Sequence, residues 1–65
     1  MKLDTPYIKL DSFMKAVDAA SSGGEAKFLI TEGKVFVNGE TELRRGRKLY
    51  PGDLVQVAEK RFLVE

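Results

Sequence analysis

The sequence contains no cysteine, no histidine and no tryptophan. Without cysteine there are no disulfides and no thiolate nucleophile, and without histidine there is no imidazole acid–base chemistry and no zinc-finger ligand set. Phosphate-loop, dinucleotide-binding and nucleophile motifs are absent as well. We therefore expect a protein that is not an enzyme and that uses neither a metal nor a cofactor.

Long apolar runs are also missing. No stretch approaches the roughly 20 apolar residues of a membrane span, and the start MKLDTPYIKL lacks the apolar core of a signal peptide. The expectation is a cytoplasmic protein with no membrane partner. Its 65 residues are 43% apolar, with four phenylalanines and two tyrosines, which suffices for one packed core. We expect a monomer with a single domain over residues 1–65, although a chain this short buries only about 60% of its unfolded surface.

The positive charge is concentrated in one segment. The net charge is only +1, so bulk charge does not indicate a nucleic-acid partner. Residues 1–33 carry four basic and five acidic side chains, whereas residues 34–65 carry seven basic and five acidic ones. Four of those seven lie within Arg44–Lys48. A local field of this kind can decide docking even when the net charge is small.

The first third of the chain predicts a short strand followed by a helix. Residues 7–10 alternate after Pro6, as an edge strand does. Asp11 is the expected N-cap of a helix over about residues 12–20. Its apolar positions recur at three- and four-residue spacing: Leu10, Phe13, Met14, Val17 and Ala20.

A second helix is predicted directly after a tight break. Ser22 and Glu25 have the Ser-x-x-Glu spacing of a capping box. Gly33 stands where a left-handed residue ends a helix. The residues expected on the inward face are Ala26, Leu29 and Ile30.

Residues 34–37 predict a strand, and Asn38-Gly39 is a strong hairpin signal. Two registers are compatible with it. A two-residue loop would place Glu42 opposite Val35, with a carboxylate on the apolar face. A three-residue loop would place Leu43 there instead, matching apolar with apolar. We predict the longer loop.

The last third predicts two further strands. Pro51-Gly52 fits the centre of a type II turn. Residues 54–58 are predicted as a β-branched strand, residues 59–60 as a turn, and residues 61–64 as a final strand with Phe62 and Val64 on one face. The fold class is α+β: two short helices packed on a small, mostly antiparallel sheet.

Arg44–Lys48 is the main functional candidate. Standing alone, it could equally be a loop kept polar for solubility. Arginine side chains, however, match phosphate oxygens in bidentate geometry, and Gly46 lets the backbone approach a ligand closely. Because these side chains should carry no core area, we expect alanine at Arg44, Arg45 and Arg47 together to abolish most binding and leave the fold intact.

Other residues could extend this surface. At Ser22-Gly23-Gly24, a simple helix cap is one interpretation, and a phosphate bound to the free helix amides is the other. Lys9 and Lys27 are either ordinary surface lysines or parts of a spread phosphate-binding face. Most aromatic residues should lie in the core, whereas Phe28 lies on a helix flank and should be partly exposed.

The segment from Ser22 to Asp53 resembles the αL RNA-binding domain named after a small-subunit ribosomal protein. The residues that meet the family pattern are Ser22, Ala26, Lys27, Leu29, Ile30, Gly33, Val35, Val37, Asn38, Gly39, Gly52 and Asp53, with Lys9, Leu10 and Asp11 upstream and a motif core over residues 10–54. The chain departs from the pattern at Gly23 and Phe28, where many members have basic residues. The glycine pair and the basic loop are similar to the small stand-alone bacterial YaaA-like branch.

This resemblance implies docking on structured RNA, ribosomal RNA or its precursor, with the ribosomal subunit as a further partner, in ribosome maturation or association. Asn38 joins the predicted site through the family pattern. The predicted RNA-binding residues are Lys9, Gly23, Gly24, Lys27, Asn38, Arg44, Arg45, Arg47 and Lys48. The alternative is a protein-interaction adaptor that presents the basic loop to an acidic partner. A DNA-binding protein is disfavoured, because no helix face combines basic residues with base-reading Asn or Gln.

Overall fold

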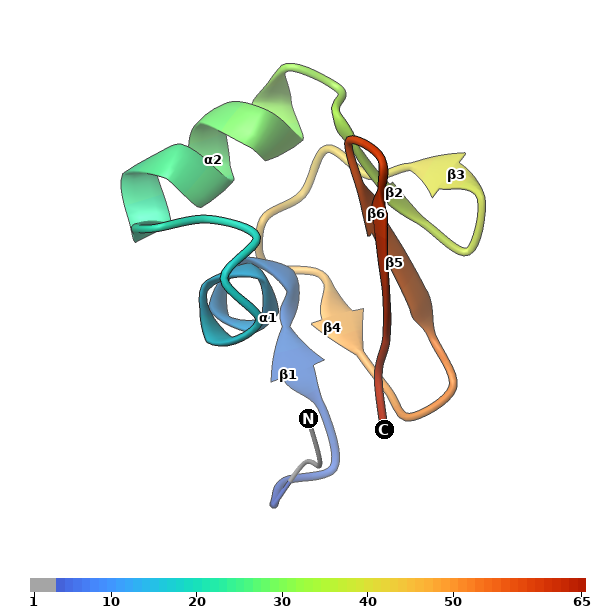
Figure 1. Ribbon diagram of the computed structural model, residues 1–65. Coiled ribbons are helices and arrows are strands. Elements are labelled where there is room, and N and C mark those ends of the chain that lie inside the picture. Colours follow the sequence, from blue (N-terminus) through green and yellow to red (C-terminus); the bar gives the residue numbers. More distant parts are fainter. Residues whose placement is uncertain (1–3) are drawn as a thin grey trace.

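The computed structural model describes residues 4–65, in which two helices and six short strands form one α+β unit. The elements in chain order are β1 (Ile8–Lys9), α1 (Leu10–Ala16), α2 (Gly23–Thr31), β2 (Val35–Val37), β3 (Glu40–Thr41), β4 (Lys48–Leu49), β5 (Leu54–Val57) and β6 (Lys60–Leu63). One sheet has the strand order β3-β2-β5-β6 and the other pairs β1 with β4, all antiparallel. Both helices lie on one side of the larger sheet (Figure 1). The predicted fold class is confirmed.

The core lies between the helix pair and the larger sheet. Its fully buried members are Leu10, Phe13, Met14, Ala26, Ile30, Val35, Leu49 and Val55. The rings of Phe13 and Phe62 meet edge to face, with centroids 6.4 Å apart, which joins α1 to β6. Neither helix among residues 4–65 is long and apolar enough to cross a bilayer.

The first helix begins and ends earlier than the sequence predicted. Lys9, not Asp11, is the N-cap, and its side chain makes no capping hydrogen bond. The Asp11 carboxylate accepts a hydrogen bond from the Ser12 amide at 2.8 Å, inside the first turn. After Ala16 the helix stops, because Asp18 adopts a left-handed φ of +61°, a conformation that Asp tolerates better than most residues. Ala20 is still buried, which explains why the periodic pattern extended too far.

The second helix matches its prediction. The Ser22 hydroxyl accepts a hydrogen bond from the Glu25 amide at 3.2 Å, and the Glu25 carboxylate accepts one from the Ser21 amide at 2.8 Å. The reciprocal pair thus closes one residue earlier than in an ideal capping box. Gly33 follows the helix with a left-handed φ of +76°, as predicted.

The predicted register of the β2–β3 hairpin is wrong. Val37 pairs with Glu40 and Phe36 with Thr41, so the loop is the two-residue one. Asn38 and Gly39 have φ values of +53° and +85°. Positive φ at both central residues matches the twist of a hairpin, and Asn-Gly adopts this turn readily. This turn preference outweighs the apolar match of the longer loop.

The last hairpin is shifted by one residue from its prediction. The turn lies at Ala58-Glu59, because Val57 pairs with Lys60. The strands are therefore 54–57 and 60–63, and Phe62 pairs with Val55 on the core side. The predicted turn at Pro51-Gly52 is present, closed by the Asp53 amide donating to the Tyr50 carbonyl at 3.0 Å.

Candidate nucleic-acid interface

The basic loop, Arg44–Lys48, lies between β3 and β4 in the chain and passes beside the start of α1. The Leu10 amide donates to the Arg47 carbonyl at 2.8 Å, and the Asp11 amide donates to the Arg45 carbonyl at 3.1 Å. These carbonyls satisfy amides of the first helical turn, which otherwise lack acceptors. The loop therefore replaces the missing side-chain cap of α1, and its backbone is fixed to the helix.

Glu42 lies beneath this loop and is only 6% exposed. Its Oε2 accepts hydrogen bonds from the Arg44 amide and from Arg44 Nε, at 3.1 and 3.0 Å. Its Oε1 accepts one from Arg47 Nη1 at 2.8 Å. The hydrogen bond from the Arg44 side chain, assisted by Arg47 and opposed by desolvation, lowers the pKa of Glu42 to about 2. An ionised carboxylate therefore holds two of the loop arginines.

Glu42 was not predicted as part of the site. The two-residue register places it on the valine side of β2, and its amide donates to the Val35 carbonyl at 2.9 Å. Buried carboxylates require charged or hydrogen-bonding partners. Arginines two and five residues later supply them, and that spacing was the signal in the sequence that could have identified Glu42.

Three of the four loop cations are exposed to solvent. Arg45 and Lys48 are exposed, and the Arg44 side chain is 77% exposed although it contacts Glu42. Arg47 is more enclosed, at 30%. Arg44, Gly46, Arg47 and Lys48 line an open hollow of about 620 Å³. A hollow lined by three cations and a glycine is suited to an anion such as a phosphate.

Lys9 lies beside the basic loop, whereas Lys27 lies on α2. Lys9 and Lys48 are directly opposite one another in the β1–β4 pair. Lys27 is exposed on α2, and no hydrogen bond or ion pair within residues 4–65 links its side chain to the loop. A surface shared by Lys27 and the arginines stays a prediction.

The glycine corner, Ser22–Gly24, begins α2. A Cβ built at Gly23 would have no heavy atom within 4 Å, and one at Gly24 would meet only the Ser22 hydroxyl at 3.8 Å. The space above this helix end is therefore open. The carboxylate of Glu25 lies in the first turn of α2, bound to the Ser21 amide, and its negative charge opposes a phosphate at this position.

Asn38 has a structural role that is independent of any ligand. Its Nδ2 donates to Asp53 Oδ1 at 3.1 Å, and its Oδ1 accepts from the Leu54 amide at 3.0 Å. Asp53 Oδ2 in turn accepts from the Tyr50 amide at 2.8 Å. Both ends of the Asn38 amide are thus occupied, and its contact with RNA stays a prediction.

Two aromatic side chains are substantially exposed. Phe28 is 58% exposed, as predicted for its position on the flank of α2. Tyr50 is 49% exposed, although the sequence placed it with the core. Phe13 is fully buried, and Phe36 and Phe62 are half-buried.

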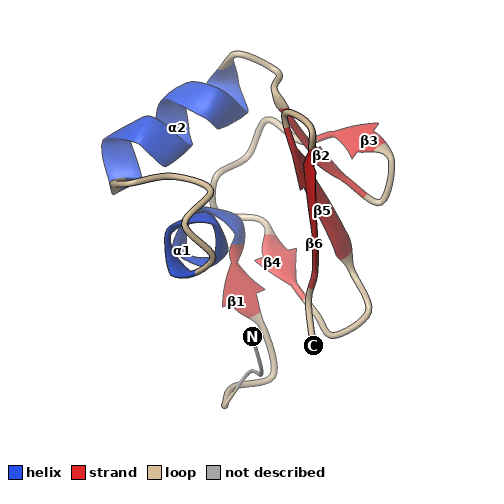
Figure 2. Cartoon of the chain, in the orientation of Figure 1, coloured by secondary structure: helices blue, strands red, loops and turns tan. Residues whose placement is uncertain are grey.

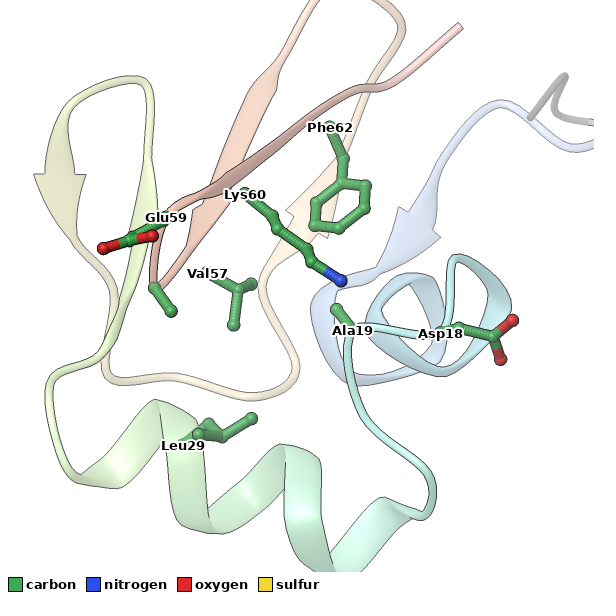
Figure 3. A pocket seen from close by; sticks show the side chains of 8 residues that line it. Asp18, Ala19, Leu29, Val57, Glu59, Lys60 and Phe62 are labelled. Atoms are coloured by element: carbon green, nitrogen blue, oxygen red, sulfur yellow. The ribbon is translucent and has the colours of Figure 1, made fainter.

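An apolar cleft of about 520 Å³ opens between α2 and the β5–β6 hairpin, and none of the loop cations lines it. Leu29, Val57 and Phe62 line its middle, and Asp18 and Glu59 lie on opposite sides with their carboxylates pointing away from one another (Figure 3). The two acids therefore do not form an acid–base pair across the cleft. Among residues 4–65, no three acidic side chains come together as potential metal ligands.

A helix pair joined by a tight corner, packed on antiparallel strands and bordered by a basic loop, defines the αL type of RNA-binding fold. The chain belongs to the S4 domain family, whose model matches residues 1–65.

Several named proteins are similar to this chain. The probable ribosome maturation protein RlbA of Bacillus subtilis is 47% identical over 57 residues, covering 88% of this chain and 80% of that protein. The putative RNA-binding protein YbcJ of Escherichia coli is 36% identical over 53 residues, covering 82% and 76%. The small ribosomal subunit protein uS4m of Schizosaccharomyces pombe is 46% identical over 52 residues, covering 80% of this chain but 16% of that protein.

Proposed function

We propose that this protein is a non-enzymatic RNA-binding protein that docks on structured ribosomal RNA, or its precursor, during ribosome maturation. The basic loop provides the main phosphate contacts, and Lys9 extends them. Lys27, Asn38 and the amides of Gly23 and Gly24 contribute from the helix and turn side. The protein acts as a monomer in the cytoplasm.

The observation that carries this proposal is the construction of the basic loop. Four cations lie within five residues, and a buried carboxylate fixes two of them in place. The loop backbone is hydrogen-bonded to α1, so the cations are presented by a rigid support. Preorganised cations bind a phosphate array with less loss of side-chain entropy than mobile ones.

The relatives support ribosomal RNA as the particular partner. One is named a probable ribosome maturation protein, and it matches most of both chains. Another is named a small ribosomal subunit protein. A shared domain of this kind favours the same class of RNA over duplex DNA or a protein partner.

The test requires variants that spare Glu42. Alanine at Arg44 and Arg47 would leave that carboxylate buried without its partners, so the expectation that the triple arginine variant keeps its fold intact needs revision. Arg45 and Lys9 are exposed and make no ion pair with carboxylates of residues 4–65. The double variant Lys9→Ala/Arg45→Ala therefore removes two surface cations without disturbing the core.

We would crosslink the protein to RNA in cells and sequence the attached RNA. The native protein should be enriched at one ribosomal RNA site, and Lys9→Ala/Arg45→Ala should lose most of that enrichment. The matched control is Lys34→Ala/Arg61→Ala, which removes the same charge from two exposed residues, one directly before β2 and one in β6, and should crosslink normally. Equal losses in both variants, or no enrichment, would refute the assigned surface. Recovery of a protein partner after nuclease treatment would instead favour the adaptor.

A further inference from the structure

One face of the β1–β4 pair carries two tyrosines and two lysines. Ile8 is opposite Leu49, and Lys9 is opposite Lys48. Because side chains alternate along a strand, Tyr7 and Tyr50 lie on the same face as the two lysines. The Tyr7 and Tyr50 ring centroids are 6.0 Å apart, which agrees with this placement. We call these four residues the tyrosine–lysine face; Figure 2 shows the two strands side by side.

The opposite face of this pair explains why the strands form, but not why the outer residues are tyrosine and lysine. Leu49 is fully buried, and Ile8 packs against the core. Two lysines directly across a strand pair repel one another, and like charges in this position are destabilising. Their ammonium groups are not in ion pairs with carboxylates of residues 4–65. A bound polyanion would relieve this repulsion.

The aromatic rings are arranged so that one remains accessible. Lys48 Nζ lies 4.9 Å from the centroid of the Tyr7 ring, over its face. Tyr7 is half-buried, whereas Tyr50 is 49% exposed. The backbone of Tyr50 is fixed, because its amide donates to Asp53 Oδ2 at 2.8 Å. Tyr50 is therefore an exposed ring on a rigid support beside two cations.

We propose that the tyrosine–lysine face binds an unpaired RNA segment, with Tyr50 stacking on a base and Lys9 and Lys48 contacting the adjacent phosphates. Bases within an RNA helix already stack on one another, so an aromatic ring is useful only to a base outside the helix. Tyr7 positions Lys48 and supports Tyr50.

Continuity with the basic loop determines where this segment lies. Lys48 belongs both to the loop and to β4, and the Arg47 carbonyl accepts a hydrogen bond from the amide of Leu10, the first residue of α1. The inference thus rests on the proposed function: the loop contacts the phosphates of a folded region, and the tyrosine–lysine face receives the single strand that leaves it. The preferred site is a junction between helical and unpaired RNA.

Tyrosine fluorescence tests the stacking directly. The chain has two tyrosines and no tryptophan, so all of this emission comes from the tyrosine–lysine face. Adding single-stranded oligouridine should quench it, because a stacked base quenches tyrosine. The Tyr50→Leu variant keeps an apolar side chain at this position and should show little quenching. Tyr7 is the one tyrosine left in this variant, so any quenching that remains would come from Tyr7. Unchanged emission from the native protein at saturating oligouridine would overturn the proposal.

Affinity measurements separate this inference from the proposed function. The ligands are a blunt RNA duplex and the same duplex with a single-stranded uridine extension. The extension should increase the affinity of the native protein by about 10-fold, the magnitude of one stacked base. Tyr50→Leu should lose that gain and bind the blunt duplex normally, whereas Tyr50→Phe should keep it.

The outcomes remain distinguishable if one proposal fails. If Tyr50→Leu weakened the binding of both RNA ligands equally and lowered the melting temperature of the protein, Tyr50 would have a purely structural role and the stacking role would be refuted. No gain from the extension in native protein would refute it independently of any variant. If Lys9→Ala/Arg45→Ala bound the blunt duplex with the affinity of the native protein, the assigned phosphate surface would be refuted instead.

Discussion

The basic loop and the glycine corner were both predicted as phosphate-binding sites, and a carboxylate lies next to each of them. At the loop, the Glu42 carboxylate lies beneath the arginines and accepts hydrogen bonds from Arg44 and Arg47. At the corner, Glu25 lies at the exposed helix end, bound to the Ser21 amide. The same functional group therefore organises one site and opposes the other. Its position relative to the surface decides which effect it has.

The largest expected difference is in salt dependence. If about five phosphates are neutralised, the affinity for structured RNA should fall by roughly two to three orders of magnitude between about 50 and 200 mM salt. Replacing Arg44, Arg45 and Arg47 by alanine, with Glu42→Gln to avoid an unpaired buried charge, should reduce the slope of log affinity against log salt by about three.

The matched measurement at the corner is the Gly23→Ala/Gly24→Ala variant. Its added methyl groups fit without a clash, since the shortest contact is 3.8 Å to the Ser22 hydroxyl, and the slope should fall by at most about one, because one phosphate is involved. Equal slopes for the loop variant and the native protein would show that the arginines do not bind phosphate. Filter binding across a salt series provides both slopes.

The second prediction concerns the stability that Glu42 contributes. Its folded pKa is about 2, below the ordinary value of 4.5. The ion pairs therefore contribute fully above about pH 4.5, and this contribution is lost as the pH falls toward 2. Glu42→Gln should cost about 1–3 kcal/mol at neutral pH, because it removes charged hydrogen bonds from an enclosed site.

Urea unfolding of native protein and Glu42→Gln at a series of pH values would measure this difference. The gap between the two curves should be constant above about pH 4.5 and close below it. Glu40→Gln is the control, since Glu40 is exposed in β3, two residues before Glu42, and its replacement should change stability by less than about 0.5 kcal/mol. A gap that did not change with pH would contradict the ionised pair.

The smallest effect is expected from Glu25→Gln. Glutamine also serves in a capping box, so the helix should lose little stability. Removing the negative charge from the helix N-terminus should raise the affinity for RNA by about twofold at low salt if the corner holds a phosphate. Unchanged affinity in the same filter-binding assay would assign the corner to helix capping alone.

The sequence predicted the elements better than their registers. The capping residues Ser22 and Glu25 identified α2 because capping chemistry is local. The β2–β3 register was wrong because apolar matching was given more weight than the backbone preference of Asn-Gly. In the structure, Glu42 is tolerated on the apolar side only because two arginines reach it from the next segment.

The site was predictable where it depended on composition and hidden where it depended on pairing. Arg44–Lys48 was evident as a dense run of charge. The proximity of Lys9 to Lys48 depends on β1 pairing with a strand some forty residues later, which no local pattern specifies. The exposure of Tyr50 was missed for the same reason, since only the β1–β4 register determines which of Leu49 and Tyr50 faces the core.

The hydrogen bonds of Asn38 constrain the chain segment between Asn38 and Asp53. The Asn38 side chain donates a hydrogen bond to the Asp53 carboxylate at 3.1 Å, and the backbone amide of Asn38 donates to the Leu54 carbonyl at 2.8 Å. The segment between them, which includes β3, the basic loop and β4, is thereby a ring closed without a covalent bond. Closing such a ring in advance lowers the entropy that the segment would lose on meeting its ligand. In the folded state of a chain with no cysteine, one side-chain amide and one carboxylate thus hold together the two ends of the segment that carries the basic loop.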